Sequence, residues 1–151
     1  MRALVRRVLS ATVSVNCKTV GEINRGLLVY LAVHKDDEDS DLGWISQKIL
    51  GMRVFEDDAK KMNISLVEKE YELLVISQFT LFGSLRKGFR PSFNNAATPK
   101  FAVGQYRKFL QVLKEKFKGR VASGEFGADM KILSIDDGPV SLWLDSKEKN
   151  Y

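Results

Sequence analysis

The chain has 151 residues, of which 44% are hydrophobic and 28% are charged, and its formal net charge is +5. This length and composition predict a single domain over residues 1–151 and exclude an intrinsically disordered chain. The single cysteine, Cys17, excludes an internal disulfide, and no apolar run approaches the roughly 20 residues that a membrane span requires. We therefore expect a cytoplasmic protein that does not contact a membrane.

The first half of the chain predicts four strands and one helix. Strands are expected at residues 3–9, 12–15 and 26–33, the last because it is apolar on both faces. An acidic cluster then precedes a helix, since acidic side chains are favoured at the positive end of the helix dipole. The buried face of this helix would consist of Leu42, Ile45, Ile49 and Met52. Residues 53–55 predict a short strand before a polar loop.

The second half predicts a central strand, a long helix and three further strands. The apolar run at 71–81 turns polar at its far end, and a basic loop follows from 83 to about 97. The second helix is expected to begin with Thr98 as its cap and Pro99 in its first turn, and to end at Gly119. Its inner face would consist of Ala102, Tyr106, Phe109, Leu110, Leu113 and Phe117. Three strands are expected at 120–126, 130–135 and 140–144, with a loose charged tail at 146–151. This order predicts an α/β or α+β domain with a large sheet and two helices.

Positive charge is concentrated between Ser84 and Arg120. This window holds ten Lys and Arg residues and a single acid, Glu115, so it carries +9 while the rest of the chain carries −4. A one-sided basic segment favours a polyanionic partner such as RNA or DNA. A solvated surface that only keeps the protein in solution explains the same charge equally well.

Few side chains in the sequence offer catalytic chemistry. His34 is the only histidine, so no histidine cluster can bind a metal, and a partly exposed position beside a carboxylate suits it best. Cys17 lies on an expected hairpin without a neighbouring base, which favours an inert thiol. The sequence contains no phosphate-binding glycine loop, nucleophile elbow or dinucleotide fingerprint. We therefore expect neither a metal nor a cofactor.

Two short motifs remain. Ser77-Gln78-Phe79-Thr80 follows the central apolar run, where its polar groups could line a pocket beside free N–H groups or only satisfy local backbone. Asp137-Gly138-Pro139 favours first a hairpin turn between two strands. The proline complicates this interpretation, because it cannot donate a ladder hydrogen bond. A cis bond before Pro139, seen in about 5–6% of such bonds, would let two carbonyl groups point the same way as a rigid wall.

Several motifs together resemble the D-aminoacyl-tRNA deacylase family over nearly the whole chain. In chain order they are Met1-Arg2-Ala3…Arg7-Val8, Gly21-Glu22-Ile23…Gly26-Leu27-Leu28, Lys48-Ile49-Leu50…Arg53-Val54-Phe55-Glu56-Asp57, Ser77-Gln78-Phe79-Thr80-Leu81, Arg86-Lys87-Gly88…Arg90-Pro91-Ser92-Phe93, Phe126-Gly127-Ala128-Asp129-Met130 and Asp137-Gly138-Pro139-Val140. One such string would be weak evidence, but all of them in order are specific. The resemblance implies a layered α/β/β fold with a large mixed sheet or barrel-like β layers.

The resemblance also implies an activity and a set of site residues. The activity is hydrolysis of the ester that joins a D-amino acid to the terminal adenosine of tRNA, with removal of glycine mischarged onto tRNA for alanine. In the implied homodimer, a cis Gly138–Pro139 element of one subunit enters the pocket of the other and excludes L-amino acids. The other implied residues are Ser77, Gln78, Phe79 and Thr80 at the reaction site, Arg7 and Met130 for chiral selection, and Arg86, Lys87 and Arg90 on tRNA.

The sequence departs from the family pattern at a few positions. Asn is expected where this chain has Asp136, Thr is expected at Ser141, and the residues at 82–85 are less typical. These changes bear on loop conformation and substrate preference rather than on the reaction.

Two mechanisms and one other class of protein remain open. Backbone donors at Phe79 or Thr80 could stabilise the oxyanion while the 2′-hydroxyl of the substrate assists the attacking water. Thr80 as a covalent nucleophile is the rival mechanism, although no base is visible to activate it. A non-catalytic RNA- or DNA-binding module is the rival from another class.

Overall fold

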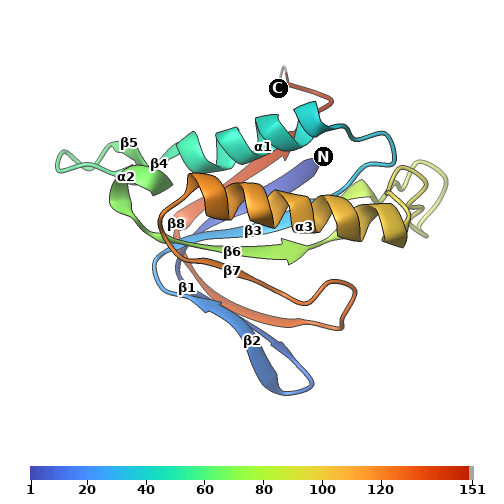
Figure 1. Cartoon of the computed structure of the whole chain (residues 1–151), viewed down its shortest axis with the longest axis horizontal. Coiled ribbons are helices and arrows are strands. Elements are labelled where there is room, and N and C mark those ends of the chain that lie inside the picture. Colours follow the sequence, from blue (N-terminus) through green and yellow to red (C-terminus); the bar gives the residue numbers. More distant parts are fainter. Residues whose placement is uncertain (150–151) are drawn as a thin grey trace.

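A six-stranded mixed sheet forms the centre of the computed structural model, which describes residues 1–149 (Figure 1). Its strands are β1 (Arg2–Val15), β2 (Lys18–Ile23), β3 (Gly26–Ala32), β6 (Glu72–Ser77), β7 (Val121–Ser123) and β8 (Lys131–Asp145). The order is β2-β1-β3-β6-β7, and β8 pairs with β1. β6 lies parallel to both β3 and β7, while β1 is antiparallel to β2, β3 and β8. The predicted fold, a layered α/β domain with a large mixed sheet, is confirmed.

Two helices, α1 (Asp39–Gly51) and α3 (Pro99–Lys116), lie side by side on one face of the sheet (Figure 1). The smaller elements are β4 (Arg53–Glu56), β5 (Met62–Ser65), the short helix α2 (Leu66–Lys69) and the 3-10 helix η1 (Phe79–Phe82). The sequence predicted a polar loop over β5 and α2, because neither element carries a periodic apolar pattern. No helix within residues 1–149 is long and apolar enough to cross a membrane.

β3 is buried on both faces, as its continuous apolar run predicts. Leu27 and Leu31 pack into the larger core under α1 and α3. Leu28 packs on the opposite face, into a smaller core that includes Val13 of β1 and Ile23 of β2. The sheet is therefore covered by helices above and by its own curled strands below (Figure 1).

The two predicted helices are present with small differences at their ends. A capping box between Glu38 and Asp41 starts α1. Thr98 and Pro99 start α3 as expected, but the helix ends at Lys116 rather than at Gly119. The cause is Phe117, which is buried against the larger core in an extended conformation and so leaves the helix direction.

The predicted strands at 3–9 and 12–15 are one continuous strand, β1, whose pairing register shifts near Val8. The expected turn at Asn16 and Cys17 is confirmed, and both residues have positive φ. The strand after that turn, β2, escaped prediction because only Gly21 and Ile23 in it are buried.

The prediction of a loose tail at 146–151 is wrong for its first two residues, Ser146 and Lys147. Ser146 is buried, and its N–H donates to the carbonyl oxygen of Met1 at 2.9 Å. Lys147 binds the carboxylate of Asp41 at 2.6 Å. Residues 150–151 lie outside the described part of the chain.

Candidate active site

An open cavity of about 600 Å³ lies at the carboxyl ends of β3 and β6. Parallel neighbouring strands end at the same edge of a sheet, where their following loops diverge and leave a crevice. Its lining includes the β6 end with Ser77, Gln78 and Phe79, the start of α3 with Pro99 and Tyr106, and the 126–132 segment. Three of the four residues of the Ser77–Thr80 motif therefore line one cavity, as the pocket interpretation predicts.

The Ser77–Thr80 motif is fixed mainly through its backbone. The N–H of Gln78 donates to the carbonyl oxygen of Leu31 at 2.8 Å, which ties the strand end to β3. The side-chain amide of Gln78 donates to Oγ1 of Thr80 at 2.5 Å. Thr80 itself is exposed and outside the cavity lining. Because η1 begins at Phe79, the first N–H groups of this turn have no acceptor within the helix.

Phe79 stands at the rim of the cavity. Its ring makes an edge-on contact with Phe93, with ring centroids 5.0 Å apart. Phe93 lines the same cavity, a role that sequence analysis did not assign to it. The sequence feature that could have indicated this role is the family motif Arg90-Pro91-Ser92-Phe93, which contains Phe93.

The cavity lining holds few groups that could transfer a proton. Burial raises the pKa of Tyr106, partly offset by a hydrogen bond with Ser123, and its hydroxyl donates to the carbonyl oxygen of Val75 at 2.8 Å. Among the described residues, Asp129 is the only carboxylate in the lining, and Lys131 binds both of its oxygens at 2.9 Å. No histidine or cysteine of the described chain lines the cavity. Hydroxyl, amide and backbone groups thus dominate its polar surface.

Met130 lines the cavity beside the smaller core. A Cβ atom at Gly124 would lie 2.5 Å from the sulfur of Met130, so a side chain there would displace the thioether. Gly124 therefore leaves room for the thioether of Met130 in its present position.

The Asp137-Gly138-Pro139 motif is a bulge rather than the predicted hairpin turn. β8 runs on through it: Asp136 pairs with Val8 and Ser141 pairs with Arg6, so residues 137–140 together face Arg7 alone. The predicted strands at 130–135 and 140–144 are therefore one strand. The Gly138–Pro139 peptide bond is cis, and both residues are exposed.

Arg7 is the side chain that holds this bulge, and its exposed fraction is only 6%. Its Nε donates to the carbonyl oxygen of Asp137 at 3.0 Å, and its Nη1 donates to the carbonyl oxygen of Val54 at 2.6 Å. Arg25 binds the carboxylate of the same aspartate at 3.0 Å. The backbone before Gly138 is thus anchored from two sides.

The bulge and the cavity lie at opposite ends of the sheet within one chain. Arg7 pairs with Leu27, and Leu27 pairs with Leu73, which precedes Ser77 by four residues. Four residues of extended strand span about 13 Å. Accordingly, neither Gly138 nor Pro139 is among the residues that line the cavity.

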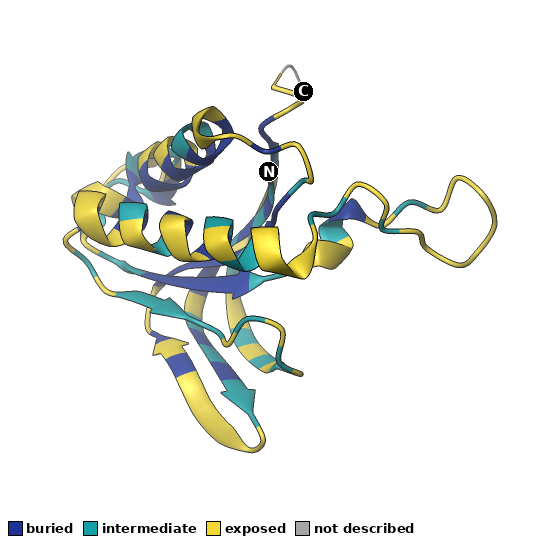
Figure 2. Ribbon diagram, turned by 45° about the vertical axis from the view of Figure 1, so that its right-hand side comes forward, coloured by how far each residue is buried: buried dark blue, intermediate teal, exposed yellow. Residues whose placement is uncertain are grey.

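Arg86, Lys87 and Arg90 lie on the loop that joins η1 to α3. Backbone hydrogen bonds between Ser84 and Ser92, at 2.8 and 2.9 Å, close this loop at its base. The three cations are exposed, and the loop projects from the body of the molecule (Figure 2). No carboxylate within residues 1–149 forms an ion pair with them.

Across residues 1–149, no group of three or more His, Cys, Asp and Glu side chains is placed to hold a metal ion. Cys17 is an exposed thiol at its turn. His34 packs its ring on Phe82, with centroids 5.2 Å apart, and lies 3.8 Å from the Asp36 carboxylate. This position agrees with the structural role expected for His34.

Comparison with known proteins gives a consistent result. A family described as D-Tyr-tRNA(Tyr) deacylase matches residues 4–145. The chain is 49% identical to the D-aminoacyl-tRNA deacylases of Petrotoga mobilis and Clostridioides difficile, over 98% of this chain and 99% of each relative. A solved structure described as c-Myc DNA Unwinding Element Binding Protein has a TM-score of 0.92 at 37% identity, covering 96% of this chain and 98% of its own.

Proposed function

The chain belongs to the D-Tyr-tRNA(Tyr) deacylase family, a family of hydrolases that cleave aminoacyl-tRNA esters, and from that premise we propose how it selects D-amino acids. The cavity at the ends of β3 and β6 receives the aminoacyl group and the terminal adenosine of tRNA. D-amino acids are released, and so is glycine mischarged onto tRNA for alanine, because glycine has no side chain to exclude. The observation that carries this proposal is the cavity formed around Ser77, Gln78 and Phe79.

Backbone groups supply the catalysis in this proposal. Water attacks the carbonyl carbon of the ester, and the bond to the ribose oxygen breaks as that oxygen takes up a proton. The N–H groups of Phe79 and Thr80 stabilise the oxyanion, an effect worth about 2.7–4 kcal/mol per donor in a measured enzyme. The 2′-hydroxyl of the substrate assists the water, because the one carboxylate that the described residues place in the cavity lining, Asp129, is paired with Lys131.

A second copy of the chain supplies the wall that excludes L-amino acids. Gly138 and Pro139 are exposed and anchored by Arg7, yet they lie about 13 Å along the sheet from the cavity of their own chain. β8 also exposes large apolar side chains, among them Leu133 at 74% and Ile135 at 56%. An exposed apolar strip of this kind suits an interface between copies, in which Gly138–Pro139 of each reaches the cavity of the other.

The basic loop binds the tRNA phosphates in this proposal. Arg86, Lys87 and Arg90 are exposed beside the cavity and free of carboxylate partners within residues 1–149. Because the substrate is a charged tRNA, we place the activity in the cytoplasm, where such tRNAs are used in translation.

The main experiment measures release of tyrosine from D-Tyr-tRNA and from L-Tyr-tRNA, with and without a chelator. Hydrolysis of the D-ester alone, unchanged by the chelator, is expected. Loss of activity in the chelator would contradict the metal-free mechanism. Thr80→Ala should keep most of its activity, since the substitution removes only the exposed hydroxyl and retains the backbone N–H that the proposal assigns to Thr80; near-complete loss in a folded variant would restore the nucleophile hypothesis.

The cross-subunit wall has its own test. Ala128→Trp fills the cavity, while Gly138→Ala disturbs the bulge. Ala128→Trp alone should abolish turnover, whereas Gly138→Ala alone should keep turnover and lose selectivity. If each site combines two subunits, refolding equal amounts of the two variants together should make about half of the active sites selective, so hydrolysis of L-Tyr-tRNA relative to D-Tyr-tRNA should fall to about half of its value in Gly138→Ala. An unchanged ratio in the mixed dimers would contradict the shared site.

A second candidate function is binding of unpaired nucleic acid without catalysis. The observation in its favour is the likeness to the solved structure described as c-Myc DNA Unwinding Element Binding Protein, together with the +9 window. Both functions predict binding that weakens with salt, so salt dependence cannot separate them. Turnover of the D-ester can, because a binding module would show none.

A further inference from the structure

The tip of the basic loop carries a fully exposed aromatic side chain. Phe89 has an exposed fraction of 102%, the largest among the exposed apolar residues of the described chain. A phenylalanine ring buries a large apolar area when it packs, and here that area faces water. Neither the core nor the cavity uses this ring.

The loop that carries Phe89 is closed at its base by hydrogen bonds. The hydrogen-bonded pair Ser84 and Ser92 closes the base of the loop, and Gly88 takes a φ of +85° immediately before the ring. That conformation is readily available to glycine, so the chain can reverse there. Phe89 therefore lies at the outer end of a loop that is closed at its base.

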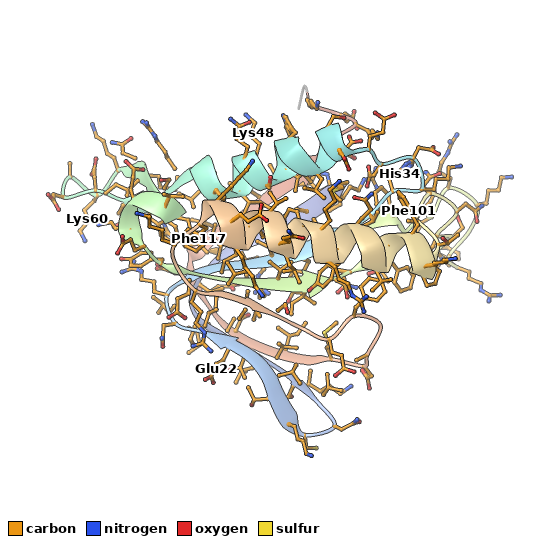
Figure 3. The ribbon with its side chains drawn as sticks, in the orientation of Figure 1. Glu22, His34, Lys48, Lys60, Phe101 and Phe117 are labelled. Carbon is orange, nitrogen blue, oxygen red and sulfur yellow. The ribbon has the colours of Figure 1, made fainter. Side chains whose placement is uncertain are left out.

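Basic residues flank Phe89 on both sides in the sequence. Arg86 and Lys87 precede Phe89, and Arg90 follows it, while no acid occurs between residues 73 and 114. Figure 3 shows nitrogen-tipped side chains extending outward from this end of the molecule, beyond the labelled Phe101 at the start of α3. An aromatic ring among unpaired cations is the composition that binds single-stranded nucleic acid, where the ring stacks on a base and the cations contact phosphates.

The loop rises from the rim of the cavity. Phe93, at its far end, lines the cavity and contacts the ring of Phe79. Gly83, at its near end, packs so closely that a Cβ atom there would lie 3.2 Å from the ring of Phe93. An RNA strand whose last nucleotide enters the cavity must leave past this rim.

We propose that Phe89 stacks on an unpaired nucleobase of the acceptor end, next to the terminal adenosine that enters the cavity. The inference rests on the proposed function, because that function places the RNA end in the cavity. Phe89 lies three residues before Ser92, a reach of up to about 10 Å when extended, so from the projecting loop it reaches nucleotides outside the cavity rather than the reacting ester. Phe89 therefore binds substrate without touching the bond that breaks.

The test compares two substrates. Stacking on one base contributes roughly 5- to 150-fold in affinity, so Phe89→Ala should raise KM for D-Tyr-tRNA by at least about fivefold and leave kcat unchanged. The D-tyrosyl ester of adenosine alone lacks the neighbouring bases, and its kinetics should not change. Phe89→Trp should keep the KM for D-Tyr-tRNA near the wild-type value. Phe89→Leu should raise it as Phe89→Ala does, because leucine is apolar but has no π-face.

Leu85→Ala is the matched control, since Leu85 is a non-aromatic apolar residue of the same loop with 62% exposure. Its KM should change less than about twofold. An unchanged KM for Phe89→Ala on tRNA, an equal loss on both substrates, or a change in oligomeric state instead would overturn the stacking contact.

A binding measurement separates this inference from the proposed function. If the wild type hydrolyses neither substrate, the deacylase proposal fails, but stacking can still be read from fluorescence. An oligonucleotide with the sequence of the tRNA 3′ end should quench the added tryptophan of Phe89→Trp beyond any change in the wild type. Absence of that extra quenching would contradict the stacking contact whatever the activity.

Discussion

The two ends of the central sheet are built in opposite ways. At the end where β3 and β6 begin, charged side chains fix the backbone: Arg7 and Arg25 both bind Asp137. At the end where β3 and β6 finish, backbone groups and glycines fix the side chains, and the cavity has no ion pair of its own except Asp129–Lys131 at its edge within residues 1–149. The bulge is therefore held by an arginine that is ion-paired with it, whereas the Ser77–Thr80 motif at the cavity is held by hydrogen bonds without a charged partner.

This difference suits two separate tasks. A wall that rejects one hand of amino acid must keep its shape when the wrong substrate arrives, so it needs anchored backbone. A cavity that accepts many different D-side chains needs space and backbone donors more than specific side chains. In the proposed dimer each site takes its rigid part from one chain and its open part from the other.

The largest effect should come from Arg7→Ala at the anchored end. It removes a buried cation and leaves the carbonyl oxygens of Val54 and Asp137 without these donors, so unfolding in urea should show a loss of about 3–5 kcal/mol. Rejection of L-Tyr-tRNA should weaken in any protein that remains folded.

Arg6→Ala is the matched control, because Arg6 is the neighbouring arginine and binds Asp136 near the surface. Its loss should be below about 1 kcal/mol. Equal losses for the two arginines would mean that the bulge is not specially anchored.

A smaller effect is expected from Gly138→Ala. The new Cβ atom would lie 2.8 Å from Nη2 of Arg7, at a φ of +127° that L-residues rarely adopt. The free energy of unfolding should fall by about 2 kcal/mol, and selectivity between D- and L-esters should fall with it.

Gly104→Ala tests the same substitution in open space on α3, where nothing lies within 4 Å of the new atom. It should be neutral or stabilise by up to about 1 kcal/mol, since alanine favours a helix. If Gly138→Ala changes the free energy of unfolding and the selectivity no more than Gly104→Ala does, the close packing of the bulge on Arg7 contributes to neither.

The contrast between the ends also explains what the sequence could predict. β3, α1 and α3 follow from apolar periodicity, which is local, and Ser77-Gln78-Phe79 follows from polar residues at a strand end. The bulge at 137–140 does not follow, because Asp-Gly-Pro favours a turn unless a partner strand continues the pairing, and that depends on register with β1. The separation between Gly138 and the cavity is likewise a property of strand order, which no local pattern contains.

Arg2 contacts η1 at the cavity end of the sheet without lining the cavity. Its Nη1 donates to the carbonyl oxygen of Leu81 in η1 at 3.0 Å, its Nε binds Asp145 at 2.7 Å, and its guanidinium lies 4.6 Å from the ring centre of Phe82. Arg2→Ala should lower kcat by roughly 5- to 10-fold, because η1 carries the proposed oxyanion donors and loses one charged hydrogen bond.

Arg2→Lys should recover part of the stability but little of kcat, since lysine cannot bind Leu81 and Asp145 with one planar fork. KM for the tRNA should stay near the wild-type value in both variants. A change in KM alone would place Arg2 in substrate binding rather than in positioning η1.

The smallest effect should follow from Asp41→Asn at the start of α1, near the cavity end of the sheet (Figure 1). Burial raises the pKa of Asp41, but hydrogen bonds from Lys147, the N–H of Glu38 and Ser146 outweigh it and lower the pKa from 3.8 to about 2. The folded state therefore gains stability from the carboxylate above pH 3.8, and this gain is lost as the pH falls towards 2.

Asp41→Asn should lower the free energy of unfolding by about 1 kcal/mol at pH 6, and by less at each step down to pH 2. Urea unfolding at several pH values measures this difference. A gap between wild type and variant that stays constant from pH 6 to pH 2 would show that the charge of Asp41 contributes nothing to stability.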